Sequence, residues 1–412
     1  MTQWRVNQWA VVLSAGSIFA GYTLILPFVP LYIQMLGVAS PSRAAVWAGL
    51  VLGISPLMAA LIGPFWGKLA DRVGLKIMAI RITLALAIIW ILTAYVQSVW
   101  QFFLLRFLLG VFAGFNSFSI ALTTQLTPQE KVGKAIGTLH AVQIISTAVG
   151  PFLGGLLAGA IGIRKTFLVT GSLSLISFLL FVFLYRDKEH PSQPRQDLET
   201  KVSSHRSFKE LMRLQNFLPL AAVLLLITVI DRSFAPVIPL FVLSLVKTPF
   251  QAARTAGLII SVASVAESLA AWNSGRKFAS APPKRFLMSR LVWGGGVCVL
   301  LAFATSVNQL LFLRVLLALL AGGTLTIAYT FASQVIPEGD RAAAFGLLSS
   351  YSMVGGAIGP LMGGFLSSIN IRGAFVANAV LYAVLIGFVW KFFRPLGTAP
   401  EPNLPVSFME GS

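Results

Sequence analysis

Two carboxylic acids stand alone in apolar stretches of this 412-residue sequence, and their positions indicate proton chemistry. Asp231 and Glu267 lie inside long apolar runs, whereas the other eleven acidic residues fall in polar connecting segments or near the chain ends. A charged side chain at the centre of a membrane costs about 2.5–3.5 kcal/mol on insertion scales, so it needs a partner or a function. Proton exchange is such a function, because a low-dielectric site favours the neutral acid and a nearby cation favours the carboxylate.

Three arginines, Arg106, Arg232 and Arg314, also interrupt apolar runs. Adjacent helical residues diverge by roughly 100°, so Asp231 and Arg232 do not form an ideal pair with each other. We expect Arg232 to reach Glu267 on the next helix, or Asp231 to pair with Arg314. The alternative is structural: an ion pair holds the second half of the chain together, and Arg106 and Arg314 are packed or snorkelling residues near helix ends.

A binding cavity for varied small molecules needs aromatic faces and a few hydrogen-bonding groups. Six residues at predicted mid-span heights are candidates: Tyr22, Asn116, Gln143, Phe234, Tyr329 and Phe331. Phe112, Phe115, Phe118 and His140 are more simply interpreted as packing residues. With three histidines and one cysteine and no cluster of them, no metal is expected. The sequence contains no phosphate-binding loop or nucleophile elbow, so we expect no cofactor, no ATP-driven step and no enzyme activity.

An internal repeat divides the chain. The segment Ala148–Gly155, with the sequence AVGPFLGG, returns 209 residues later as Ala357–Gly364, with the sequence AIGPLMGG. Membrane helices tolerate such Gly and Pro residues, and small side chains let two helices approach closely. The predicted helix-packing residues are therefore Gly150, Pro151, Gly154, Gly155, Gly359, Pro360, Gly363 and Gly364.

Other matches share the offset of 208 or 209 residues. They include Arg106 with Arg314, and Tyr22 with Asp231. A repeat of half the chain length is typical of transporters, whose binding site lies between the halves. Tyr22 and Asp231 should then both face the central axis, which makes Asp231 the preferred proton carrier and Glu267 the second choice.

The composition and the lengths of the apolar runs predict an all-α membrane protein of twelve transmembrane helices in two pseudo-symmetric six-helix bundles. The chain is 57% hydrophobic and only 11% charged, and about 20 apolar residues cross a bilayer. The predicted organisation is a first bundle at 1–185, a cytoplasmic linker at 186–214, a second bundle at 215–395 and a disordered cytoplasmic tail at 396–412. The predicted spans are 9–37, 45–66, 77–97, 100–123, 136–160, 164–184, 216–245, 253–274, 286–305, 309–332, 342–367 and 372–394.

The basic residues sort by side of the membrane. Of the 31 Lys and Arg residues, 22 fall on the side that carries both termini and six on the other. Because cytoplasmic loops carry the excess of Lys and Arg, both termini are predicted to be cytoplasmic. The net charge of +18 then faces anionic lipid headgroups, and no readout motif accompanies it that would indicate nucleic-acid binding.

The loop predicted between spans two and three has the sequence GKLADRVGLK, from Gly67 to Lys76. Gly67 and Gly74 are expected to bracket a tight turn. Asp71, beside Arg72, could meet the positive N-terminus of a neighbouring helix and act as a conformational latch. The alternative is a plain turn that carries positive-inside charge.

Together with the twelve spans and the repeat, this loop resembles the signature loop of the major facilitator superfamily. It departs from the family at Leu75, where the family has Arg, and the second-half counterpart has Ala279 where Asp71 would be. Arg106–Gly110 resembles the R-x-x-x-G element of the family, and Gly150–Gly155 resembles the motif of its drug–proton antiporters. The stretch around Pro27–Tyr32 is similar to twelve-span bacterial multidrug-resistance exporters, in particular those of an MdtG-like branch.

The resemblance implies a monomeric protein of the bacterial inner membrane that expels amphipathic drugs or other small molecules in exchange for protons by alternating access. It implies close packing of span five against span eight at Gly150 and Pro151, and of span eleven against span two at Gly359 and Pro360. It also assigns Arg106 and Arg314 to charge compensation during proton transfer. Two other functions remain open: a proton-coupled or facilitative carrier of one metabolite, such as a sugar, siderophore or organic anion, and a membrane sensor that no longer transports.

Overall fold

The computed structural model describes residues 3–186, 210, 212, 216–277, 283–337 and 340–393. The predicted linker and tail lie almost wholly outside these residues. Within the described ranges the chain is helical and contains no β-strand. The first-half elements are α1 (Gln3–Leu24), the 3₁₀-helix η1 (Leu26–Phe28), α2 (Val29–Met35), α3 (Pro41–Val73), α4 (Leu75–Tyr95), α5 (Val99–Val111), α6 (Phe115–Leu126), η2 (Gln129–Lys131), α7 (Val132–Ala160), α8 (Ile163–Leu179) and the π-helix η3 (Leu180–Leu184).

The second half follows the same order: α11 (Phe217–Leu245), α12 (Pro249–Lys277), α13 (Pro283–Ala302), α14 (Val307–Ala321), α15 (Thr324–Val335), α16 (Arg341–Ile369) and α17 (Ile371–Phe392). These helices make twelve segments that are long and apolar enough to cross a bilayer, which confirms the predicted fold class. Several exceed the predicted lengths. The second, Pro41–Val73, has 33 residues, about 50 Å at 1.5 Å per residue, so it extends beyond a hydrocarbon core of about 30 Å.

Spans four and ten are each broken at the same place in the repeat. Gly114 has φ = 117° and separates α5 from α6, and Gly323 has φ = 80° and separates α14 from α15. Residues with a Cβ rarely adopt such left-handed values, whereas glycine does so at little cost. The two glycines are 209 residues apart, so the repeat extends to the interruption of a membrane helix.

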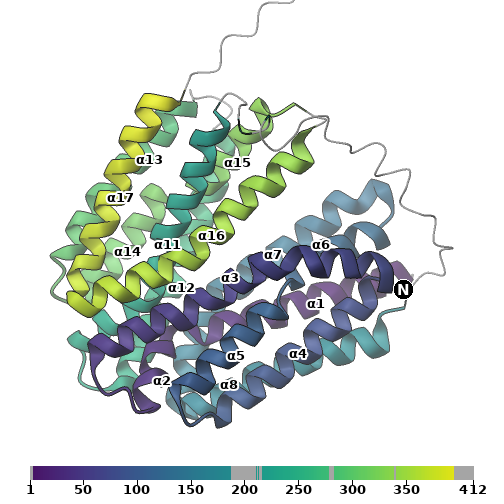
Figure 1. Cartoon of the computed structure of the whole chain (residues 1–412), viewed down its shortest axis with the longest axis horizontal. Helices are drawn as coiled ribbons and strands as arrows, with labels where there is room; N and C mark the ends of the chain where they lie inside the picture. Colours follow the sequence, from purple (N-terminus) through teal and green to yellow (C-terminus); the bar gives the residue numbers. More distant parts are fainter. Residues whose placement is uncertain are drawn as a thin grey trace, which may run out of the picture.

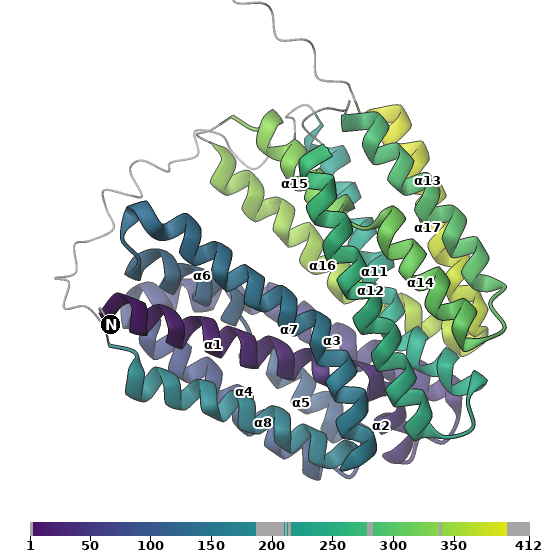
Figure 2. The same ribbon diagram turned by 180° about the vertical axis from the view of Figure 1, so that it is seen from behind.

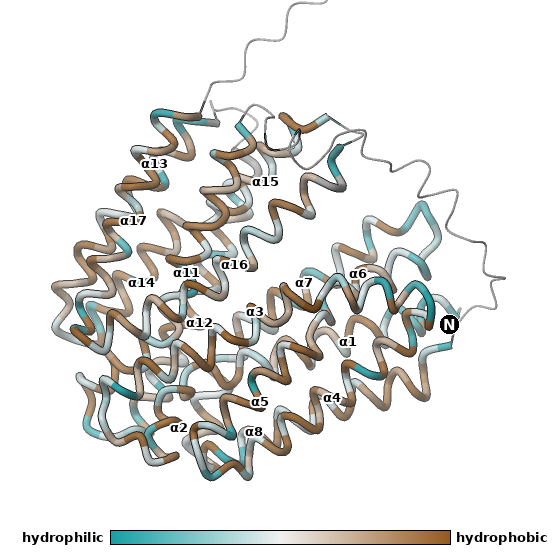
Figure 3. The backbone as a smooth tube through the Cα atoms, viewed as in Figure 1, coloured by the Kyte–Doolittle hydropathy of each residue, from teal (hydrophilic) through white to brown (hydrophobic). Residues whose placement is uncertain are grey.

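The two halves lie side by side and splay apart at one end (Figure 1). The first six spans form one group and the last six the other. They meet along α3 and α16 on one face, and along α7 and α12 on the opposite face (Figure 2). The first residues of α1 and the last of α17 lie at the splayed end. Hydrophobic residues run along most of the length of the helices, with hydrophilic residues gathered near their ends, as expected for a membrane bundle (Figure 3).

Backbone contacts join the halves at the end opposite the termini. A Cβ built on Gly257 of α12 would lie 2.3 Å from the carbonyl oxygen of Pro151, and one on Gly155 of α7 would lie 2.6 Å from that of Ala253. The second seam is equivalent, with Gly364 at 2.3 Å from the carbonyl oxygen of Ala45. Only glycine permits helices to pack this closely, so these residues define where the halves touch.

Gly150 and Gly359 do not contact the spans of the other half that were predicted for them. Gly150 packs against Thr23 of α1, within its own half, and Gly154 packs against Leu24. Likewise Gly359 and Gly363 pack against α11 at Val229 and Ser233. Because neighbouring residues point roughly 100° apart on a helix, Gly150 and Gly154 face α1, while Pro151 and Gly155 face α12. Each repeated motif therefore serves one contact within its half and one between the halves.

Candidate functional site

The second half contains a cluster of charged groups at the level of the membrane interior. Asp231 is the middle residue of α11, with fourteen residues on either side. Glu267 of α12 is half-buried and lies in the electrostatic field of Asp231, Arg314 and Arg232. The field of this cluster also acts on the phenol of Tyr382 on α17, which is 4% exposed. Arg314 of α14 lies against Phe234 of α11, three residues beyond Asp231, and α12, which carries Glu267, packs against both α11 and α14. The three charged side chains therefore come from three helices that pack together.

Arg314 holds its position in this cluster by packing on an aromatic ring. Its guanidinium carbon lies 4.3 Å from the ring centroid of Phe234, one of the predicted cavity residues. Cation–π contacts of this kind stabilise a desolvated cation by about 1–2 kcal/mol. Its Nε is buried and has no hydrogen-bond partner among the described residues. The guanidinium of Arg314 is thus fixed against α11 by its contact with Phe234.

Arg232 makes only a long contact with its neighbour Asp231, in line with the expectation that adjacent helical residues do not form an ideal pair. Its Nε lies 3.7 Å from Oδ2 of Asp231, with side chains 55% and 38% exposed respectively. A pair this long and this exposed stabilises little. Arg232 lies against the backbone of α16 at Gly359. A Cβ built on this glycine would come within 2.8 Å of the Cβ of Arg232.

The first half carries an arginine without a carboxylate. Arg106 of α5 is 1% exposed, and none of its three guanidinium nitrogens has a hydrogen-bond partner within the described ranges. Its charge lies over aromatic rings, 5.0 Å from the centroid of Trp90 and 5.2 Å from that of Phe102. Tyr22 interacts with it electrostatically. Tyr22 and Asp231 occupy equivalent positions in the repeat, and so do Arg106 and Arg314. The equivalent arginines therefore interact with a phenol in the first half and with a carboxylate in the second.

The remaining predicted cavity residues fall into two polar groups and one packing residue. The amide of Gln143 donates to Oδ1 of Asn116 at 3.2 Å, and its own Oε1 lies 3.2 Å from Nδ1 of His140. Tyr329 stacks on Phe345, with its hydroxyl 3.3 Å from that of Ser352. Phe331 lies elsewhere: it is 2% exposed and packs against Phe393. Its place in the core separates it from Tyr329, which is only two residues away along the helix.

The structure changes the description of the predicted latch. Gly67 lies inside α3, which continues through Asp71 and Arg72 to Val73, so no turn begins at Gly67. Gly74 alone makes the turn, with φ = 89°. Asp71 therefore occupies the last turn of its own helix, where the negative end of the helix dipole disfavours a carboxylate. The contact of Asp71 with the N-terminus of a neighbouring helix, which the latch requires, stays a prediction.

One cation with buried nitrogens near this loop was not predicted from the sequence. Arg81 of α4 places its guanidinium carbon 3.4 Å from the ring centroid of Trp66 on α3, and all three of its guanidinium nitrogens are buried without hydrogen-bond partners in the described part of the chain. The indole nitrogen of Trp66 in turn donates to the carbonyl of Val111 at 2.6 Å. The only signal in the sequence was Trp66 itself, a tryptophan near the predicted membrane boundary. Its residue type does not indicate that Arg81 packs on its ring.

Comparison with known proteins decides the family. The sequence profile described as Major Facilitator Superfamily matches residues 11–292 and 250–408. The chain belongs to the major facilitator superfamily. Among its relatives is the multidrug resistance protein MdtG of Citrobacter koseri, 33% identical over 394 residues, which cover 95% of this chain and 96% of the relative. The MdtG protein of an Escherichia coli strain is 32% identical, with 95% of each chain covered.

Solved structures show the same fold at lower sequence identity. A bacterial homologue of the lysosomal transporter Spinster, in an inward-facing and unoccupied conformation, gives a TM-score of 0.75 at 18% identity, covering 95% of this chain and 97% of that one. The nucleoside transporter NupG gives 0.75 at 15% identity, covering 96% and 100%. The major facilitator member described here is thus a multi-pass protein of the bacterial inner membrane and not an enzyme, which confirms the resemblance found in its sequence. The part of the chain that the structure describes holds no group of three or more potential metal ligands.

Proposed function

We propose that this protein is a proton-coupled exporter of amphipathic small molecules, with Asp231 and Glu267 as the proton-carrying groups. The observation that carries the proposal is the cluster of Asp231, Glu267 and Arg314 on three helices of the second half. Full-length relatives that are named multidrug resistance proteins supply the direction and the substrate class. This kinship favours drug export over a carrier for one metabolite and over a sensor that no longer transports.

The chemistry follows from the arrangement of charges. Two carboxylates, Asp231 and Glu267, share this site with the positive charges of Arg314 and Arg232. Like charges that lie close together repel, so the two carboxylates are suited to hold one proton between them. When the site opens to the other side of the membrane, or when a cationic substrate enters, the balance shifts toward the ionised form. Release of that proton on one side and its recovery on the other couples the two fluxes.

The halves are proposed to rock against each other as units, residues 1–185 against 215–395. Both termini are placed in the cytoplasm on the basis of the distribution of Lys and Arg. With this orientation, the splayed end in Figure 1 is cytoplasmic and the conformation is inward-facing. The glycine seams at the far end then form the closed periplasmic gate, and monomers suffice because each chain contains both halves.

The test is transport in inside-out membrane vesicles. Vesicles that contain the wild-type protein should accumulate a fluorescent cation such as ethidium when respiration acidifies them, and an uncoupler should abolish the accumulation. Asp231→Asn should abolish uphill accumulation while leaving downhill equilibration of ethidium intact. The matched control, Glu130→Gln, neutralises an exposed carboxylate of η2 in the first half, away from the cluster. Full uphill transport by Asp231→Asn and Glu267→Gln, alone and together, would remove these carboxylates from the mechanism.

A further inference from the structure

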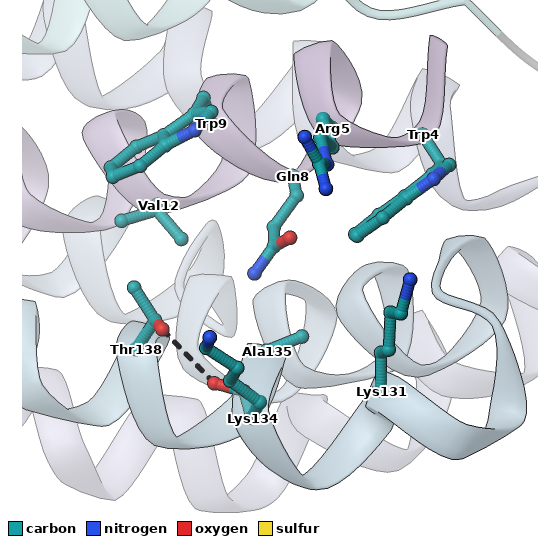
Figure 4. A pocket seen from close by; sticks show the side chains of 9 residues that line it. All are labelled: Trp4, Arg5, Gln8, Trp9, Val12, Lys131, Lys134, Ala135 and Thr138. Carbon is teal, nitrogen blue, oxygen red and sulfur yellow. Dashed lines mark hydrogen bonds between the residues drawn. The ribbon is translucent and has the colours of Figure 1, made fainter. Parts of the chain in front are cut away.

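A groove between the first turns of α1 and α7 is unrelated to the proposed transport site. It measures about 350 Å³ and lies at the splayed end of the first half. Trp4, Arg5 and Trp9 line it from α1, Lys131 from the end of η2 and Lys134 from α7 (Figure 4). In Figure 2, α1 and α7 run side by side along the near face of the first half. The side chains of Arg5, Trp9, Lys131 and Lys134 are exposed, so the groove is open to the surroundings of the protein.

The groove is strongly cationic. Arg5, Lys131 and Lys134 contribute three positive charges and no acidic residue lines it. Among the residues that the structure describes, no carboxylate forms an ion pair with any of the three. Aromatic faces keep two of them in place instead, since the guanidinium of Arg5 and the ammonium of Lys131 each lie 5.5 Å from the ring of Trp4. Three unpaired cations on two helices make a site for an anion.

The apolar inner end of the groove indicates which kind of anion it binds. Its inner end is apolar, formed by Val12, Ala135 and the indole of Trp9, which is 48% exposed. Trp9 lies four residues beyond Arg5, so about 6 Å along α1 separates its indole from the charge of Arg5. That is the thickness of a headgroup layer, about 5–7 Å on each side of the hydrocarbon core. Tryptophan is also enriched at this boundary.

We propose that this groove binds the headgroup of an anionic phospholipid, with the phosphodiester between Arg5, Lys131 and Lys134 and the start of one acyl chain against Trp9 and Val12. A free phosphate would use only the charged half of the groove and would leave its apolar half empty. Under the orientation proposed above, the lipid belongs to the cytoplasmic leaflet. The lipid site itself requires neither that orientation nor proton coupling.

Native mass spectrometry of the purified full chain tests this site. The protein is incubated with equal amounts of phosphatidylglycerol and phosphatidylethanolamine, and the ratio of the two bound species is measured. The test variant is Lys131→Gln/Lys134→Gln. The control is Arg285→Gln/Lys391→Gln, which removes the same charge from the splayed end of the second half. Each cation near an anionic surface contributes about fivefold to binding, so we expect the test variant to lose about twenty-five-fold of the preference and the control to keep it.

Two further measurements identify the occupant. Trp9→Ala should weaken phosphatidylglycerol binding several-fold without changing the net charge, because the acyl chain loses its contact. Millimolar glycerol 3-phosphate should not displace the lipid. Equal losses in the test and control variants would show that the preference comes from general surface charge, and displacement by glycerol 3-phosphate would assign the groove to a soluble phosphate. Either result overturns the lipid site and leaves the ethidium transport test unaffected.

Discussion

Adding one methyl group to each seam between the halves should force the protein out of the conformation described here. A Cβ on Gly257 would lie 2.3 Å from the oxygen of Pro151, and one on Gly364 would lie 2.3 Å from that of Ala45. Ordinary contact begins near 3.4 Å, so each methyl group is about 1.1 Å too close to backbone that cannot rotate away. Overpacking of this kind costs about 1–3 kcal/mol per site, which shifts an equilibrium roughly 5- to 150-fold.

The two seams share no residue, so their effects should add. In Gly257→Ala/Gly364→Ala the far end can no longer close, and the splayed end should close instead. Spin labels at positions 137 and 346, which lie on α7 and α16 toward the splayed end, report this as a shorter distance in double electron–electron resonance. The single native cysteine, Cys298, is buried and is replaced by alanine in all samples.

Gly63→Ala/Gly387→Ala is the matched control, because a Cβ at either position meets no atom within 4 Å. It carries the same gain in helix propensity without the steric conflict. The reasoning would be refuted if the distance distribution of the seam variant matched those of the control and the wild type. The glycines would then be tolerant of larger side chains, and the halves would not be in tight contact.

Three further predictions concern single side chains. Asp71→Asn should shift the conformational equilibrium by about 1–2 kcal/mol and impair ethidium efflux at unchanged expression; normal efflux would leave Asp71 with no role as a latch. Arg106→Gln removes a buried charge that makes no hydrogen bond among the described residues, so the melting temperature should hold while proton-coupled efflux falls, and the opposite pattern would make Arg106 structural. Trp66→Ala removes the ring under Arg81 and the hydrogen bond to Val111, and should cost about 2–3 kcal/mol of stability. Trp293→Ala, the same substitution at a residue that is 59% exposed, is the control, and equal melting temperatures for the two would contradict this role.

The membrane fold could be predicted from sequence because its main constraints are local. A run of about 20 apolar residues identifies each span whatever lies around it, and the repeat showed that the second half copies the first. The interruptions at Gly114 and Gly323 could not be predicted, since the sequence holds 36 glycines and membrane helices tolerate many of them. The turn expected at Gly67 failed for the same reason, because the residue lies inside a helix.

The candidate site was predicted in part. The rarity of acids in apolar runs was enough to find Asp231 and Glu267, because burying a charge is costly at any position in a membrane. Contacts between helices depend on helix rotation, which the sequence does not contain. That is why Gly150 was assigned to the wrong neighbour, Phe331 was assigned to the cavity instead of to the core, and the pairing of Arg81 with Trp66 was missed.

Substrate-induced proton release is the most direct test of the proposed coupling. The purified protein in detergent, in weakly buffered solution, is mixed with ethidium at a pH where one carboxyl group of the cluster is protonated, and the change in pH is recorded. We expect release of up to one proton per wild-type molecule, with little or none from Asp231→Asn/Glu267→Gln although that variant still binds ethidium. Undiminished proton release by the double variant would contradict the central claim, because no other acidic residue lies in the membrane-spanning part of the second half that the structure describes.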